Sequence, residues 1–355
     1  MLETQASKTA MLRILVAVLA AAVSVAAFGL YDVFVLEVGP LKEGPPQATP
    51  YHFLRGVCAF LAAGLIVAAI LGAREERALR PVPRSSAADR WVIRGIAILS
   101  LTTLLIFGLD AEIFSQISSE DGVVEDLSAL ALLAAAAGLA LVVARSLSAG
   151  DALKALAFAG LAAGCFVTGM EEISWGQRLV GFDSPEVFVK YNQQQEFNLH
   201  NLWSDLAENI YYVGAVGFLI VLPFLHDVVP LVGVDHPLAA VLPERKVIFA
   251  SGLAAAYNWD MWRVVPIQLS FYLALLILGY YLIQAFRGDS RDRGLIMLVF
   301  FALLANQATF LIWGEHQSWT WATTEYKELF IPLGFLFYAA SVLARERAAR
   351  FQLRE

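Results

Sequence analysis

Apolar runs long enough to cross a lipid bilayer recur along the whole chain. The chain has 355 residues, of which 59% are hydrophobic and 16% are charged, whereas a soluble domain carries about 25% charged residues. A helix of about 20 residues spans the hydrocarbon core of a membrane. The pattern therefore predicts an all-α, polytopic transmembrane bundle that forms a single domain over residues 1–355.

Ten membrane spans are predicted. The run that begins at Met11 is too long for the apolar region of a cleaved signal peptide, so we interpret it as the first span. The seventh run is short and rich in Ala, Ser and Gly, and such small residues favour close packing inside a bundle. Cys58 and Cys165 lie in apolar runs and indicate no disulfide framework. The expected spans cover about 11–36, 51–73, 91–109, 127–145, 153–171, 205–225, 246–262, 264–286, 295–313 and 325–344.

The distribution of basic residues predicts the orientation. Loops on the cytoplasmic side of a membrane are enriched in Lys and Arg. With an inner N-terminus and ten spans, the inner segments hold nineteen of the 25 Lys and Arg residues, and every inner loop is basic. We therefore expect both termini in the cytoplasm, a location in a bacterial plasma (inner) membrane, and an outer, periplasmic loop at 172–204.

A polar cluster at the outer end of the fifth span is the most unusual feature of the chain. It reads GMEEISWGQR and is followed by Ser184 and Pro185, which predict the start of a short interfacial helix. Ionisable residues at a membrane boundary are costly and usually face a partner or a cavity. This loop supplies the candidates Glu171, Glu172, Trp175, Gln177, Arg178, Asn198, His200 and Asn201.

The outer end of the ninth span carries a second polar group. It contains Asn306 within the membrane and Trp313, Glu315 and His316 at the boundary. Hydrogen bonding between helices is the alternative interpretation of Asn306. Seven of the eight tryptophans fall at the outer side, although interfacial anchors normally populate both membrane faces. We expect the fifth and ninth spans to be neighbours there.

The stretch GMEEISWGQRLVGFDSPE, followed by NLHNL, resembles a signature of bacterial multi-pass membrane proteins of unassigned function. The resemblance covers residues 169–203 and implies no activity. A weaker likeness, in architecture only, links the chain to the C-type glycosyltransferases that use lipid-linked sugars. In that class, acidic residues of the first outer loop act beside the membrane, and Asp32 has a comparable position.

The candidate residues suit acid–base chemistry on a lipid headgroup or a lipid-linked sugar. The catalytic candidates are carboxylates and imidazoles, which exchange protons near neutral pH when their surroundings favour it. The binding candidates add an Arg for phosphate and Trp faces for a sugar ring. We expect a pocket that joins Glu171 or Glu172, His200, and Glu315 or His316. Its wall would contain Trp175 and Arg178, and the further binding candidates are Gln177, Asn198, Asn201, Asn306 and Trp313.

Other functions remain open at this point. Carboxylates with imidazoles also suit a divalent metal, but no H-E-x-x-H motif exists, so no cofactor is predicted and a metal is a minority alternative. A transporter or flippase, or a lipid-binding accessory protein, would use the same polar ends. Membrane lipids are the expected partners, and nothing indicates nucleic acid or an oligomeric state. Asp205 and Glu208 are interpreted as caps of the sixth span, and Glu325 and Glu328 as complements to a helix dipole.

Overall fold

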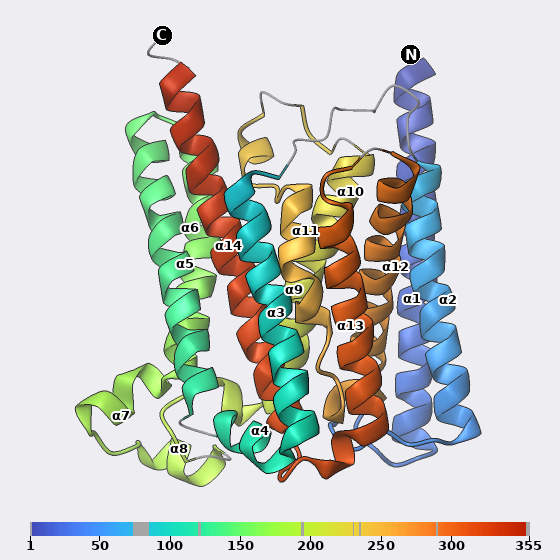
Figure 1. Cartoon of the computed structure of the whole chain (residues 1–355), viewed down its shortest axis with the longest axis vertical. Coiled ribbons are helices and arrows are strands. Elements are labelled where there is room, and N and C mark those ends of the chain that lie inside the picture. The colour runs from blue at the N-terminus through green and yellow to red at the C-terminus, as the bar shows by residue number, and fades with distance from the viewer. Residues whose placement is uncertain are drawn as a thin grey trace.

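A computed structural model describes residues 2–73, 85–119, 122–192, 195–229, 231–233, 236–288 and 290–352. Within these ranges, the side chains of residues 2–8, 10, 178, 179 and 350–352 are not described. All regular elements of the described chain are helical. The long helices run side by side to form one bundle (Figure 1). The predicted helical membrane bundle is therefore confirmed.

The helices follow the apolar runs of the sequence and end where polar or turn-forming residues follow. The longer ones are α1 (Leu2–Phe34), α2 (Pro50–Gly72), α3 (Ala87–Leu109), α5 (Val123–Ser148), α6 (Ala152–Glu172), α12 (Val265–Arg287), α13 (Arg293–Trp313) and α14 (Ala322–Gln352). A further crossing is continuous through α9 (Ser204–Val216), a π-helical turn η3 (Gly217–Val221) and α10 (Leu222–Val228). Short helices α4 (Ala111–Ile117), α7 (Gln177–Val180) and α8 (Glu186–Tyr191) lie at one end of the bundle (Figure 1).

Nine helices in the described part of the chain are long and apolar enough to cross a membrane. Each begins within four residues of the predicted start of a span. One of the ten predicted spans, 246–262, has no matching helix of this length, because the segment is not a single helix. It consists of α11 (Arg245–Ser251), a 3₁₀ turn η5 (Gly252–Ala255), a non-helical stretch at 256–258 and a second 3₁₀ turn η6 (Asp260–Arg263).

The broken segment runs through the interior of the bundle, with every residue from Val247 to Met261 buried. Non-helical backbone is tolerated at membrane depth only where it is buried in protein or lines a cavity. Here two side chains of α13 hold the broken segment, one through its backbone and one through a side chain. Asn306 Oδ1 accepts the backbone N–H of Tyr257 at 3.1 Å, and Gln307 Oε1 accepts Asn258 Nδ2 at 2.7 Å. The predicted interhelical role of Asn306 is thus present, but toward a broken helix.

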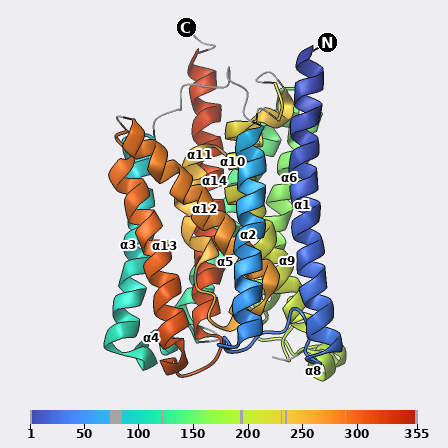
Figure 2. The same ribbon diagram turned by 90° about the vertical axis from the view of Figure 1, so that its right-hand side faces the viewer.

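The two ends of the bundle differ. Both termini lie at one end, and α4, α7 and α8 lie at the opposite end (Figure 1); we call the latter the loop end. α12 packs against α2 and α13, while α14 packs against α5 and α11. α1 and α2 form one side of the bundle (Figure 2).

Candidate functional site

The loop that follows α6 is held in place by Glu171. Its Oε1 accepts the indole N–H of Trp175 at 2.6 Å, and its Oε2 accepts the backbone N–H groups of Leu199 at 2.5 Å and of His200 at 3.0 Å. The carboxylate is buried, with 7% of the residue exposed. These bonds satisfy the charge at a membrane boundary, where an unpaired carboxylate would cost several kcal/mol.

The backbone of this loop is strained at its start. Ser174 and Trp175 have φ angles of 47° and 55°, a left-handed conformation that costs a non-glycine residue about 1 kcal/mol or more. Side-chain bonds hold it: Ser174 Oγ donates to Glu196, and Trp175 donates to Glu171. The loop is therefore fixed by its own polar side chains.

Gln177 and Asn198 also serve the loop. Gln177 Nε2 donates to Ser184 Oγ at 2.8 Å, and its Oε1 accepts the backbone N–H of Phe197 at 2.7 Å. Asn198 Oδ1 accepts Asn192 Nδ2 at 2.7 Å. Ser184 is therefore engaged within the loop, and α8 begins after Pro185 without a side-chain cap. The side chain of Arg178 lies outside the described residues.

Glu315, His316 and Trp313 are exposed and do not join His200. His316 Nδ1 lies 3.0 Å from the carbonyl oxygen of Trp313. α13 packs on α3 and α12, so the predicted proximity of the fifth and ninth spans is not observed. Helix packing, which sequence periodicity does not determine, separates the two polar groups.

A cavity of about 440 Å³ opens instead between α9, α14 and the loop that joins α1 to α2. His200 and Asn201 line it at one edge, and Trp319 and Trp321 line it elsewhere. Five carboxylates face it, whereas its described lining contains one Lys and no Arg, and that Lys is Lys42. We call it the acidic cavity; its carboxylates are Glu43, Asp205, Glu208, Glu325 and Glu328.

Glu328 and Glu208 are the deepest acids of this cavity. Glu328 accepts a hydrogen bond from the hydroxyl of Tyr212, and Glu208 lies close enough to Glu43 to share a hydrogen bond. Glu172 is half-buried near Glu328, with Glu125 and Tyr211 also close.

A buried Lys lies beneath the acidic cavity. Lys327 is 1% exposed, its Nζ donates to Asn258 Oδ1, and it lies 4.7 Å from the centre of the Tyr212 ring. Asp260 is fully buried and accepts a hydrogen bond from Thr324, while its Oδ1 has no partner among the described residues. Thr324 lines the acidic cavity, so the broken segment places Asp260 directly behind the cavity wall.

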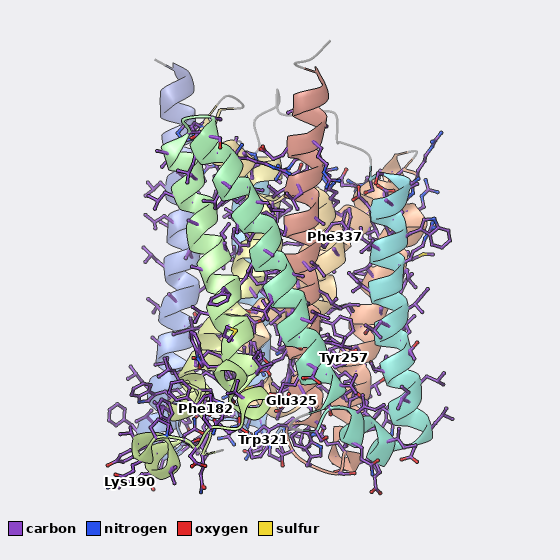
Figure 3. The ribbon with its side chains drawn as sticks, turned by 90° about the vertical axis from the view of Figure 1, so that its left-hand side faces the viewer. Phe182, Lys190, Tyr257, Trp321, Glu325 and Phe337 are labelled. Atoms are coloured by element: carbon purple, nitrogen blue, oxygen red, sulfur yellow. The ribbon has the colours of Figure 1, made fainter. Side chains whose placement is uncertain are left out.

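The region behind the wall of the acidic cavity is closed toward the bundle centre by aromatic rings. Tyr257 stacks on Phe330 at 5.1 Å between ring centroids, and Tyr326 stacks on Phe114 at 4.3 Å. Figure 3 shows Tyr257 further from the loop end than Glu325 and Trp321. The acidic cavity is therefore open toward the loop end and packed shut behind Asp260 and Lys327.

The sequence analysis did not identify Glu208 and Glu328 as site residues, because it interprets them as residues that stabilise helix ends. Glu208 and Glu328 were interpreted as helix-end residues, yet both face the cavity. α14 begins at Ala322, three residues before its predicted start, so Lys327 and Glu328 lie deeper in the helix. A Lys–Glu pair followed by an apolar run was the available signal, since such residues in a span mark functional sites.

No group of three or more His, Cys, Asp or Glu residues with a metal-binding arrangement occurs among the described residues. Comparison of the chain with protein-family models, curated proteins and solved structures finds no match in any of the three.

Proposed function

We propose that the protein is a membrane-embedded enzyme that receives the polar headgroup of a lipid or lipid-linked substrate in the acidic cavity. The observation that carries the proposal is the pair Glu208 and Glu328, two half-buried carboxyl groups from α9 and α14 that face one cavity at an end of the bundle. Titratable groups in different surroundings divide the roles of acid and base.

The surroundings assign a role to each carboxyl group. Glu208 lies beside another carboxyl group, Glu43, so it holds a proton that it can donate. Glu328 accepts a hydrogen bond from the hydroxyl of Tyr212 and has Lys327 and His200 nearby, so we assign it the role of proton acceptor. Trp319 and Trp321 supply flat faces at the mouth for a sugar ring or a cationic headgroup.

The location follows from the charge pattern. We infer ten crossings, nine helical and one through the broken segment 245–263, because both termini lie at one end (Figure 1). The basic loops at that end favour the cytoplasm. The acidic cavity would then open to the outer face of a bacterial plasma membrane.

Transport is the second candidate, and the broken segment favours it. Transporters form substrate sites where membrane helices are discontinuous. Here α11 ends inside the bundle, and Asp260, which follows it, lies directly behind the wall of the acidic cavity. An enzyme is favoured over a transporter because the aromatic rings around Tyr257 close the path behind that wall.

Lipid and glycan profiles of a strain that lacks the gene separate these functions. Accumulation of one lipid or lipid-linked precursor, reversed by the wild-type gene, is the result expected of the enzyme. Unchanged lipids with altered uptake of a solute would instead support the transporter. Unchanged lipids and unchanged uptake would favour a non-catalytic lipid-binding protein.

A further inference from the structure

A second cavity at the loop end has the opposite charge. It has a volume of about 240 Å³ and lies between α2, η6 and the loop after α1. Its charged lining residues are Arg55, Arg263 and Asp32, and His52 lines it as well. We call it the basic cavity. Two guanidinium groups against one carboxylate leave a positive charge beside a cluster that is otherwise acidic.

Arg55 is buried and only partly paired. It is 2% exposed, and its Nη1 lies 3.1 Å from Asp32 Oδ2. Its Nε and Nη2 atoms are buried and have no hydrogen-bond partner among the described residues. A buried guanidinium donor without an acceptor is costly, and it marks the place where an acceptor would bind.

Asp32 does not bond the remaining donors of Arg55, and its second oxygen accepts from Tyr51. Tyr51 OH donates to Asp32 Oδ1 at 2.5 Å. Arg263 adds a half-buried cation to the same cavity, with Arg55, Asp32 and Asp205 as its charged neighbours. His52 lies between Arg55 and Thr49, whose Oγ1 is 2.7 Å from His52 Nδ1. These groups together form a built anion site.

An apolar groove lies between α1 and α2, the helices that form one side of the bundle (Figure 2), and Tyr51 in its wall bonds Asp32 of the basic cavity. Its volume is about 480 Å³, and Ala27, Phe28, Tyr31 and Leu54 line it together with Tyr51, the partner of Asp32. Phe28 and Tyr31 approach the Tyr51 ring at 6.0 and 4.7 Å between centroids. The groove faces the region that lipid chains would occupy.

We propose that the basic cavity binds the phosphate group of a lipid whose hydrocarbon chain lies in the groove between α1 and α2. Arg guanidinium groups bind phosphate through paired hydrogen bonds, and the open Nε and Nη2 of Arg55 offer such a pair. The groove identifies the source of the phosphate as a lipid rather than a free ion. This inference does not depend on the reaction proposed for the acidic cavity.

Binding of phosphatidic acid to the purified full-length chain in detergent tests the proposal. Diacylglycerol with the same chains is the phosphate-free probe, and inorganic phosphate is the chain-free probe. The primary variant is Arg263→Gln, because loss of Arg55 would leave Asp32 unpaired and could unfold the site. Lys190→Gln is the matched control, since it removes the same charge at the same end from an exposed position in α8 that lines neither cavity.

Native mass spectrometry should show phosphatidic acid bound in preference to diacylglycerol and to inorganic phosphate. Arg263→Gln should weaken the phosphatidic acid complex about tenfold or more, and Lys190→Gln should leave it unchanged. Filling the groove with Ala27→Trp should also weaken it. Equal binding by wild type and Arg263→Gln would overturn the anion site, and equal binding of inorganic phosphate would overturn the lipid as its source.

Discussion

Glu171 and His200 are joined twice, although 29 positions separate them in the sequence. Glu171 Oε2 accepts the backbone N–H of His200 at 3.0 Å and lies 3.4 Å from the Nδ1 of the same residue. The contact ties the end of α6 to the chain just before α9. It places His200 at the edge of the acidic cavity.

Glu171→Ala should destabilise the loop between α6 and α9. The substitution removes the acceptor of Trp175 and of two backbone N–H groups, and each lost bond to a charged group costs about 1.5–3 kcal/mol before relaxation. We expect a lower melting temperature and faster proteolysis within residues 173–199. Glu315→Ala, at an exposed position on the same end, is the control and should change neither quantity. Equal behaviour of the two variants would show that the anchor is unimportant.

Gly314→Ala should lower stability because there is no space for a methyl group. A Cβ at Gly314 would lie 2.3 Å from Trp259 Cδ1, and Trp259 is part of the broken segment. Overpacking of a rigid ring typically costs about 1–3 kcal/mol. Gly64→Ala in α2 is the matched control, since nothing lies within 4 Å of its added methyl, and helix propensity favours Ala there. Thermal melting in detergent should separate the two, and an unchanged Gly314→Ala protein would contradict this packing.

Asn306→Leu should loosen the broken segment itself. The change leaves the buried N–H of Tyr257 without an acceptor, a loss of about 1–3 kcal/mol. In the variant, hydrogen exchange of the Tyr257 amide should be faster than in wild type. The melting temperature of the variant should also be lower. Thr309→Val, one helical turn away in α13, is the control. It removes a polar group from the same helix and should leave the exchange rate of the Tyr257 amide unchanged. Similar exchange rates in wild type and Asn306→Leu would exclude the role of Asn306 as a backbone partner.

Cysteine labelling tests the inferred orientation. After replacement of Cys58 and Cys165, a single Cys at Lys190 in α8 should react with an impermeant reagent added to intact cells. A Cys at Arg291, in the loop between α12 and α13, should react only after lysis, because this loop belongs to the end with the termini. Labelling of position 291 from outside would invert the orientation.

The positions of the nine described helices that are long and apolar enough to cross a membrane could be predicted from the sequence, because such helices depend on local hydropathy. The sequence did not reveal the break in the segment 245–263, since Asn306 and Gln307 support the break from 49 positions away. Hydropathy reports how apolar a segment is and not which backbone groups are bonded. Likewise, the polarity of Glu208 and Glu328 was visible, but their convergence depends on the packing of α9 and α14 around Tyr212.

In the candidate site, too, some features were visible in the local sequence and others depended on how the helices pack. The cluster GMEEISWGQR was correctly identified as unusual, and Glu171 does contact Trp175 and His200. What could not be predicted was that these bonds would satisfy the cluster internally. The acidic groups that face the cavity belong mostly to α9 and α14, which carry less polar sequence and therefore gave a weaker signal.

Complementation of a deletion strain by Glu328→Gln tests the central claim most directly. The amide keeps the size of Glu328 and can still accept from Tyr212, so folding and membrane abundance should be normal, while proton acceptance is lost. Glu186→Gln in α8, at an exposed position on the same end, is the control. The measurement is the lipid and glycan profile of each strain by mass spectrometry.

The account predicts that Glu186→Gln restores the wild-type profile and that Glu328→Gln, at equal abundance, leaves the profile of the deletion strain with a loss of turnover of about 100-fold or more. Full restoration of the wild-type profile by Glu328→Gln would contradict the assignment of the acidic cavity as the catalytic centre.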